Sequence, residues 1–270
     1  NSTRSHENGL QIGGKRTVFA EERQQEIVRR AREAGRVDVA SLSTELDVTP
    51  ETVRRDLTAL ERAGLVRRVH GGAIAIERLG FEPAVSARET VLTAEKARIG
   101  KAALAELPDE GAIVIDAGTT TRQFAELLPS EVELMVVVNS PQLAMLLARR
   151  PNVTVMMLGG RVRSRTLAVV SNWATNALTG IHVDVAFMAT NGISVERGLT
   201  TPDPAEAAVK RAMMGCARRT VLLADHTKIG NDYFARFGEL PDVDTFITDT
   251  GAEAELVDEI AEAGPRVVLA

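Results

Sequence analysis

From Ala94 onward, short apolar runs alternate with stretches whose apolar residues recur at helical spacing. The runs occupy 112–115, 134–138, 153–158, 183–189, 221–224, 245–248 and 267–269, and the helical stretches cover 94–106, 120–128, 141–149, 172–179, 204–218 and 253–263. A continuous apolar run is typical of a strand that is buried on both faces. Buried strands that alternate with helices build a mainly parallel sheet covered on both sides. The pattern therefore predicts a doubly wound α/β domain over 94–270.

The first part of the chain follows a different pattern. Apolar residues at helical spacing predict helices over 19–34 and 39–46, and Thr49-Pro50 supplies an N-cap and a first helical residue for a third helix. Two β-prone runs around Gly71-Gly72 predict a hairpin. Three helices followed by a hairpin are the outline of an α+β winged helix-turn-helix domain, which we place at 19–76.

Two segments lack a clear period. Residues 1–18 are polar and rich in Gly, Ser and Asn, and we expect a disordered tail; residues 77–93 are expected to be a linker. No stretch has the ~18–20 consecutive apolar residues of a membrane span, and no apolar region of a signal peptide is present. We therefore expect a cytoplasmic protein with no membrane partner.

Charge is unevenly divided between the two parts. Residues 1–76 carry 13 Lys and Arg against 11 Asp and Glu, whereas residues 77–270 carry 19 against 26. The helix-turn-helix part is thus the basic one, as contact with DNA phosphates requires. Aromatic residues make up only 3% of the chain, too few for stacking on single-stranded bases, so duplex DNA is the expected nucleic acid.

The third helix has a polar, cationic face opposite an apolar face formed by Val53, Leu57 and Leu60. The N-terminal residues of such a helix enter the major groove, where Arg binds guanine and Thr and Arg bind phosphates. The candidate DNA-binding residues of the helix and hairpin are Thr49, Thr52, Arg54, Arg55, Arg67, Arg68 and His70. Asp56 lies near the buried edge of this helix, where a structural ion pair is expected.

Polar residues follow the apolar runs of the second domain, and the carboxyl ends of parallel strands meet at one edge of a sheet. The segment DAGTT at 116–120 follows the first run and opens a helix, whose free N–H groups and dipole favour an anion. The candidate effector-binding residues at this edge are Asp116, Gly118, Thr119, Thr120, Asn139, Ser140, Gly159, Gly160, Arg161, Glu206, Lys210, Asp225 and Lys228. Glu206 and Lys210 are alternatively a solvated i,i+4 pair.

Several kinds of site are excluded by the sequence. The only cysteine, Cys216, cannot form an internal disulfide or a thiolate zinc site, and the four histidines lack metal-ligand spacing, so no metal is expected. We expect Cys216 to be a small buried hydrophobic residue. Neither G-x-G-x-x-G nor G-x-x-x-x-G-K-[ST] occurs, so no nucleotide cofactor is expected. A smaller phosphorylated ligand suits the DAGTT loop better.

Two groups of motifs resemble the DeoR family of bacterial transcription regulators. The first comprises VTPETVRRDL at 48–57 and GLVRRVHGGA at 64–73, and the second comprises DAGTT at 116–120, LGG at 158–160, GLTT at 198–201 and DHTKIG at 225–230. The resemblance implies a sensor domain with a fold similar to ribose-5-phosphate isomerase, a phosphorylated sugar as effector, and repression of a sugar-catabolic operon. The family tends to have Gly-Pro where this chain has Ser171-Asn172, and the different backbone freedom of these residues can alter ligand preference or subunit packing.

These features predict a transcriptional repressor that a phosphorylated sugar releases from operator DNA, and not an enzyme. Operator half-sites lie about one helical turn or a multiple apart, so a homodimer or homotetramer is expected. Two alternatives stay open. One is a sugar-phosphate isomerase-like enzyme with an accessory DNA-binding domain, in which Asp116, Glu206 or Asp225 serves as acid or base. The other is a DNA-binding regulator that needs no effector.

Overall fold

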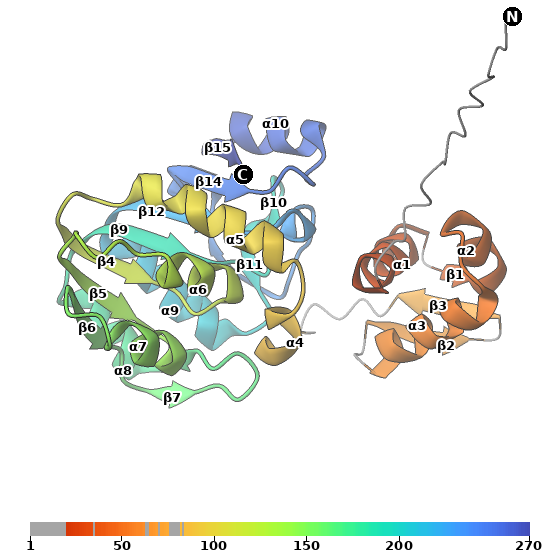
Figure 1. Ribbon diagram of the computed structural model, residues 1–270, viewed down its shortest axis with the longest axis horizontal. Coiled ribbons are helices and arrows are strands. Elements are labelled where there is room, and N and C mark those ends of the chain that lie inside the picture. The colour runs from red at the N-terminus through yellow and green to blue at the C-terminus, as the bar shows by residue number, and fades with distance from the viewer. Residues whose placement is uncertain (1–19, 35, 63–64, 70, 76–81, 83) are drawn as a thin grey trace, which may run out of the picture. The chain divides into compact units, whose positions relative to one another are not determined.

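The computed structural model describes residues 20–34, 36–62, 65–69, 71–75, 82 and 84–270 (Figure 1). The chain divides into two compact units between Glu77 and Arg78. The tail expected at 1–18 lies outside the described residues. Among the described helices, none is both long and apolar enough to cross a membrane.

The first unit combines helices with a small antiparallel sheet. Its elements are α1 (Ala20–Ala34), β1 (Arg36–Asp38), α2 (Val39–Glu45), α3 (Pro50–Arg62), β2 (Val66–Val69) and β3 (Gly72–Ala75), and the strand order is β1-β3-β2. The side chains at the centre of its core are Ile27, Ala31, Leu42, Val53, Leu57, Leu60 and Val66. The prediction of a winged helix-turn-helix is confirmed.

Strand β1 is not predicted by the sequence. Its three residues include one apolar side chain, Val37, so no alternation marks the segment as a strand. The strand forms because residues 36–38 pair with 72–74 of β3. Gly72 permits this pairing, since a Cβ at that position would lie only 2.0 Å from the Val37 carbonyl oxygen. Tertiary pairing rather than local pattern therefore creates β1.

The second unit is built on a seven-stranded parallel sheet. Its strands are β4 (Gly111–Ile115), β5 (Leu134–Val138), β6 (Val153–Met157), β9 (Val183–Met188), β12 (Ala217–Leu223), β14 (Thr245–Thr248) and β15 (Arg266–Leu269). The order across the sheet is β15-β14-β12-β9-β4-β5-β6, and all neighbours are parallel. Each of the seven predicted apolar runs is one of these strands, so the predicted mainly parallel sheet is confirmed.

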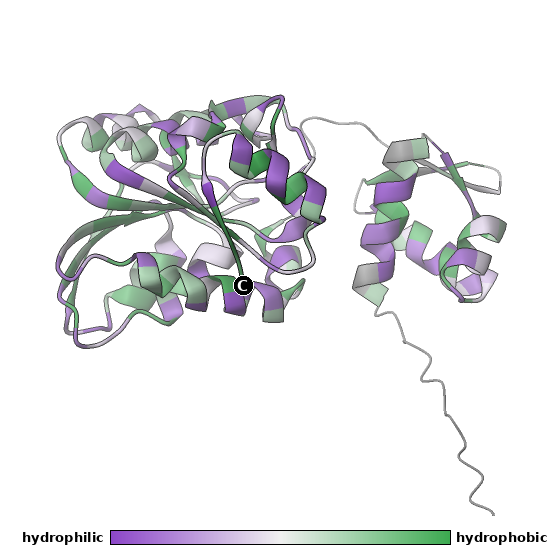
Figure 2. Ribbon diagram, turned by 90° about the horizontal axis from the view of Figure 1, so that it is seen from above, coloured by the Kyte–Doolittle hydropathy of each residue, from purple (hydrophilic) through white to green (hydrophobic). Residues whose placement is uncertain are grey.

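Helices cover both faces of this sheet (Figure 2). They are α5 (Thr93–Ala102), α6 (Thr119–Glu126), α7 (Pro141–Leu147), α8 (Asn172–Thr179), α9 (Pro204–Gly215) and α10 (Ala254–Glu262). One core contains Ile99, Phe124 and Leu143 from α5, α6 and α7, and the other contains side chains of α8, α9 and α10. Phe124 stacks on Phe187 of β9 with ring centres 4.1 Å apart, which seats α6 on the sheet. Cys216 is buried in the second of these cores, as expected, and burial raises the pKa of its thiol.

Several smaller elements are absent from the sequence-based prediction. A short helix, α4 (Val85–Glu89), lies within the segment expected as a linker. Strands β10 (Gly192–Ser194), β11 (Gly198–Thr201) and β13 (Ala235–Gly238) form an antiparallel sheet, and β7 (Arg161–Val162) pairs with β8 (Val169–Val170). Three 3-10 turns, η1 (Ala103–Glu106), η2 (His226–Lys228) and η3 (Leu240–Asp242), complete the elements of the described residues.

A buried ion pair joins α1 to α3 in the first unit. Asp56 is 3% exposed, its Oδ2 lies 2.5 Å from Arg23 Nε, and its Oδ1 accepts from Gln24 Nε2 at 2.9 Å. The structural ion pair expected for Asp56 is therefore present. Because α3 carries the candidate DNA-binding face, this pair also fixes that face relative to α1.

Replacing Asp56 with Ala should destabilise the first unit by about 3 kcal/mol, because it removes one member of a buried ion pair and the acceptor of the Gln24 hydrogen bond. Amide hydrogen exchange in α1 and α3 measures this loss as a lower opening free energy. Glu51→Ala removes an exposed carboxylate from the same helix and should cost no more than about 0.5 kcal/mol. Equal effects of the two substitutions would show that the buried pair contributes nothing specific.

Candidate DNA-binding and effector sites

Helix α3 presents a cationic surface on the side away from the core of the first unit. Arg54 and Arg55 are exposed, whereas Val53 and Leu57 are buried. Arg54 Nη1 lies 3.5 Å from a Glu51 carboxylate oxygen. Exposed pairs of this kind are weak, so the guanidinium can exchange its partner for a phosphate at little cost.

Thr49 and Thr52 are fixed at the N-terminus of the same helix. The Thr49 hydroxyl accepts from the Thr52 N–H at 3.2 Å, and the two hydroxyl oxygens lie 2.9 Å apart. Thr49 is therefore the N-cap that the sequence predicts. The two hydroxyls lie at the end of the helix that enters the groove in helix-turn-helix proteins.

The hairpin lies beside the exposed face of α3. Arg68 of β2 donates from its side chain to the Thr58 hydroxyl at 3.2 Å, and its backbone N–H donates to Glu61 Oε1 at 2.9 Å. The structure thus brings Arg68 next to the helix that carries Arg54 and Arg55. The side chain of Arg67 and all of His70 lie outside the described residues.

In the second unit, the carboxyl ends of β4 and β9 lie side by side where the strand order reverses. The chain continues from β4 to β5 on one side and from β9 to β12 on the other. Ligand sites of open α/β sheets occur at such a switch point. Asp116 follows β4 and Ala189 follows β9, and the Ala189 N–H donates to Asp116 Oδ2 at 3.2 Å.

Asp116 is the centre of a buried polar network at this switch point. Asn139 Nδ2 donates to Asp116 Oδ1 at 3.0 Å, and Lys210 Nζ forms an ion pair with Asp116 Oδ2. Asn139 Oδ1 in turn accepts from the Ala117 N–H at 2.6 Å, and Lys210 Nζ donates to the Ala189 carbonyl at 2.9 Å. The three side chains are at most 4% exposed. The network therefore fixes the backbone that leads from β4 into α6.

Glu206 and Lys210 do not form the solvated pair that the sequence leaves open. Both lie on α9 and each is 4% exposed. Lys210 turns toward Asp116, with its Nζ 5.3 Å from the centre of the Phe237 ring. Glu206 instead accepts from Arg163 Nη1 at 2.6 Å and from the Thr166 hydroxyl. The two residues therefore belong to separate networks one helical turn apart.

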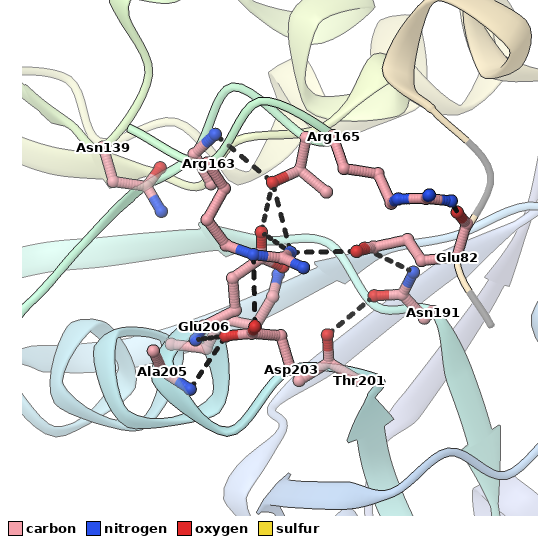
Figure 3. Close-up of polar contacts among 12 residues, drawn as sticks. Glu82, Asn139, Arg163, Arg165, Asn191, Thr201, Asp203, Ala205 and Glu206 are labelled. Carbon is pink, nitrogen blue, oxygen red and sulfur yellow. Dashed lines mark hydrogen bonds and ion pairs between the residues drawn. The ribbon is translucent and has the colours of Figure 1, made fainter. Parts of the chain in front are cut away.

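Arg163 is the centre of the second network (Figure 3). Its Nη1 lies 2.8 Å from Glu82 Oε2, and its Nε lies 3.2 Å from Asp203 Oδ2. Burial alone would lower the pKa of this guanidinium, but its bonds to Glu206 and Glu82 raise it above the ordinary value. Glu82 is 2% exposed although it belongs to the expected linker. This part of the linker is therefore fixed to the second unit.

Two hollows that share several lining residues open at the N-terminus of α6. Glu89, Thr119 and Arg122 line both. The first hollow is also lined by Val85, Gly118, Ser140, Gln142, Leu143 and Thr166, and the second, of about 250 Å³, by Thr93, Lys96 and Gln123. Of the predicted effector residues, Gly118, Thr119 and Ser140 line the first hollow. The structure thus brings together part of the predicted site, at the loop that Asp116, Asn139 and Lys210 hold in place.

Asp225 and Lys228 lie at the end of β12. Asp225 is 1% exposed and accepts from the Thr227 N–H at 3.2 Å, and Lys228 Nζ lies 3.7 Å from its carboxylate. Burial would raise the pKa of Asp225, but the charge of Lys228 and the Thr227 hydroxyl lower it. The charge of Lys96, which lines the second hollow, also lowers this pKa. Asp225 therefore interacts electrostatically with the cationic wall of that hollow.

Gly159, Gly160 and Arg161 are placed differently from the other candidates. All three are exposed, and they lead into β7 beyond the end of β6. Gly160 has φ of 146°, and a Cβ there would lie 2.9 Å from the Val170 carbonyl oxygen. Neither of the two hollows is lined by these residues. Gly160 therefore permits the close approach of the chain to Val170 at the open end of the β7–β8 hairpin.

Residues 23–78 match the DeoR-like helix-turn-helix domain, and residues 92–250 match the DeoR C terminal sensor domain. The chain belongs to the DeoR family. It is accordingly a helix-turn-helix transcriptional regulator with a sensor domain, and not an enzyme.

Individual relatives agree with this assignment over nearly the whole chain. The HTH-type transcriptional regulator GlpR of Haloferax volcanii is 38% identical over 92% of this chain and 96% of its own. The HTH-type transcriptional repressor GlcR of Bacillus subtilis is 32% identical over 86% of this chain and 89% of its own.

Among solved structures, ribose 5 phosphate isomerase A from Neisseria gonorrhoeae is similar over 50% of this chain and 52% of its own, with 18% identity and a TM-score of 0.35.

Ser171, which departs from the motif expected from the family resemblance, is the N-cap of α8 in this chain. Ser171 has φ of 153° and ψ of 173°, a region that glycine adopts far more readily than serine. Its hydroxyl accepts from the Trp173 N–H at 3.2 Å, which caps the helix. The side-chain cap therefore offsets part of the strain of this backbone conformation at Ser171.

Sequence reasoning missed Glu82, Arg122 and Arg163. Arg122 lies three residues after Thr119 on one helix, so helical spacing alone places the two on the same face. Glu82 and Arg163 are 81 residues apart and lie outside the predicted helices and strands. Their pairing depends on the β7–β8 hairpin and the course of the linker, neither of which has a local sequence signal.

A histidine–carboxylate pair joins the ends of β12 and β14. His226 Nδ1 donates to Asp249 Oδ2 at 2.7 Å, and the His226 N–H donates to Asp249 Oδ1 at 2.8 Å. The bond to Asp249 raises the pKa of His226 above 6.5. Burial would raise the pKa of Asp249, but its bonds to His226 lower it to about 2. The contact with Asp249 therefore favours the charged form of His226, and the contact with His226 favours the charged form of Asp249.

Substituting Asp249 by Asn should lower the pKa of His226, because it removes the largest cause of the rise; burial still lowers the pKa, and the charges of Asp225 and Glu95 still raise it. Histidine NMR titration measures this change. The stabilisation by the pair is full between the ordinary pKa values of 3.8 for Asp249 and 6.5 for His226, and it is lost as pH rises through the raised pKa of His226 or falls through the pKa of about 2 of Asp249. Asp232→Asn, whose carboxylate binds Ser194 instead, should not alter the titration. An unchanged pKa of His226 in Asp249→Asn would refute the ion pair.

Proposed function

We propose that the protein represses a sugar-catabolic operon by binding operator DNA and that a phosphorylated sugar releases it. The observation that carries this proposal is the start of α6, where Thr119 and Arg122 line both hollows and Gly118 and Ser140 line the first. The first N–H groups of a helix have no partner within it and, with the positive end of its dipole, favour an anion. A guanidinium beside them adds charged donors suited to a phosphate dianion. The repressor name of the relative GlcR supports the direction of regulation.

The buried network behind the hollow supports a site that is formed before the ligand arrives. Asp116, Asn139 and Lys210 are bonded to one another and to the backbone of the loop that enters α6. A loop fixed in this way loses little conformational freedom when a ligand binds. Gly118 allows this loop to pack closely against Ala189 and Thr121, since a Cβ at position 118 would lie 2.9 Å from both Ala189 Cβ and Thr121 Oγ1.

The first unit supports binding to duplex DNA through the exposed residues of α3. Arg54 and Arg55 are placed to reach base edges or phosphates, and Thr49 and Thr52 to reach the phosphate backbone. Arg68 in the hairpin is placed to contact the flanking backbone. We further propose that two or four copies bind together, because paired half-sites match a two-fold symmetric protein.

The direct test is fluorescence anisotropy of the full chain on DNA from upstream of its own gene. The titration is done at fixed salt, because phosphate contacts make DNA affinity strongly salt-dependent. It is repeated with a panel of sugar phosphates and with the matching free sugars. Specific binding that one sugar phosphate abolishes supports the proposal. Specific binding that survives every compound refutes the effector part, and absence of specific binding refutes the operator part.

Arg55→Ala should weaken operator binding by about 1–3 kcal/mol if the guanidinium contacts a base, because a bidentate contact to guanine is lost. Anisotropy on operator and on scrambled DNA of equal length measures the effect and its specificity. Arg149→Ala removes the same charge from an exposed position in the second unit and should leave operator affinity unchanged. If Arg55→Ala behaves like Arg149→Ala, Arg55 makes no operator contact.

Thr119→Val should raise the concentration of effector needed for DNA release by about tenfold, because a hydrogen bond to a charged phosphate contributes about 1.5–3 kcal/mol. Valine keeps the size and branching of threonine, so operator affinity without effector should not change. Thr179→Val, an exposed substitution of the same kind on α8, should leave both properties as they are. Release at the original concentration would mean that the effector binds elsewhere.

A further inference from the structure

Arg122 lies in α6 one turn after its first residue and lines both hollows. Two carboxylates hold different atoms of its guanidinium. Glu126 Oε1 lies 2.9 Å from Nε, and Glu89 Oε1 lies 3.1 Å from Nη1. Glu126 belongs to α6 itself, whereas Glu89 comes from α4. The Glu126 contact therefore orients the guanidinium through Nε, within α6 itself. The Glu89 contact joins Nη1 to a second helix, α4.

Helix α4 is the first helix after the DNA-binding unit along the chain, and the residues around it are anchored at both ends. Before α4, Arg165 donates to the Glu82 carbonyl, and the Val85 N–H donates to the Arg165 carbonyl at 2.8 Å. At the C-terminal end of α4, Lys96 Nζ donates to the carbonyls of Arg88 and Val91 at 2.6 and 2.5 Å. The Glu89–Arg122 ion pair is a third contact, and both of its residues line both hollows.

We propose that Arg122 binds the phosphate of the effector and that Glu89 occupies its place in the free protein, so that the ligand displaces the carboxylate. Glu89 lines the same hollows as the start of α6, which is where an anion is favoured. A phosphate dianion accepts more hydrogen bonds than a carboxylate and carries more charge, so it competes well for the same guanidinium. The Glu126 contact to Nε does not need to break during this exchange.

The exchange gives the effector unequal contacts with two states of the protein. A ligand shifts an equilibrium only by such a difference in affinity. Here the state with Glu89 on Arg122 keeps α4 attached at three places, and the ligand-bound state loses one of them. Because residues before α4 lead directly to the DNA-binding unit, the exchange changes how firmly the end of the linker is held. This inference rests on the proposed function, since it names the residues through which that function acts.

The test measures binding of inorganic phosphate to the full chain by calorimetry, at ionic strength held constant with chloride. Arg122→Gln should weaken phosphate binding at least about tenfold, because a charged hydrogen-bond donor is lost. Arg122→Lys should recover part of the affinity, since a lysine supplies charge without the planar fork. Glu89→Gln should tighten phosphate binding about two- to fivefold. This factor is the free energy of a surface ion pair expressed as a ratio of dissociation constants.

Glu95→Gln is the matched control for Glu89→Gln. Glu95 lies on the neighbouring helix α5, pairs with Arg98 at 3.7 Å and does not line the hollows, so the same loss of charge there should leave phosphate affinity unchanged. Equal tightening in both variants would show a general charge effect and overturn the exchange. Unaltered affinity in Arg122→Gln would overturn the assignment of Arg122.

Hydrogen exchange of the amides at 85–89 tests the displacement itself. Saturating phosphate should speed exchange there in the unaltered protein, because α4 loses its contact to Arg122. The increase should be absent in Glu89→Gln, in which that contact is already lost. Slower exchange on adding phosphate would mean that the ligand clamps α4, and would overturn the proposal. If sugar phosphates still release operator DNA in any of these failures, the proposed function survives without this mechanism.

Discussion

The ion pair between Lys210 and Asp116 is the contact on which the sensor domain depends most. It joins α9 to the carboxyl end of β4, and both side chains are at least 95% buried. Two charges in such a place are stable only when each has further hydrogen bonds, and here Asn139 and two backbone groups of Ala189 supply them. Because β4 and β9 flank the reversal of strand order, the pair fixes the point at which ligands of such sheets bind.

The same helix holds the linker. Glu206 lies one turn before Lys210, and through Arg163 it is connected to Glu82, which precedes α4. Helix α9 therefore bonds both to the loop at the start of α6 and to the segment that leads to the DNA-binding unit. A ligand that disturbs either contact acts on a helix common to both. This arrangement explains why two charged residues at i,i+4 spacing are buried and separately paired instead of lying in solvent.

The fold could be predicted wherever one segment alone carries the signal. The seven strands appear as apolar runs because both faces of a parallel sheet are buried, and Thr49-Pro50 marks α3 because capping is local. By contrast, β1 forms only against β3, and Arg163 meets Glu82 across 81 residues, so neither leaves a local pattern. The candidate site divides in the same way. Gly118 and Thr119 follow from their place after β4, whereas Glu89 depends on a helix within an apparently aperiodic linker.

The small free energy of the Glu89–Arg122 ion pair limits how much its loss can change DNA affinity. An exposed ion pair contributes about 0.2–1 kcal/mol, whereas a tenfold change in DNA affinity needs about 1.4 kcal/mol. Loss of this contact in one copy is therefore too little for release from an operator. Two copies that bind one operator together double the contribution to at most about 2 kcal/mol, which lies within the 1–3 kcal/mol typical of allosteric coupling. The regulation that we propose through α4 therefore depends on the oligomer that we also propose from the pairing of half-sites.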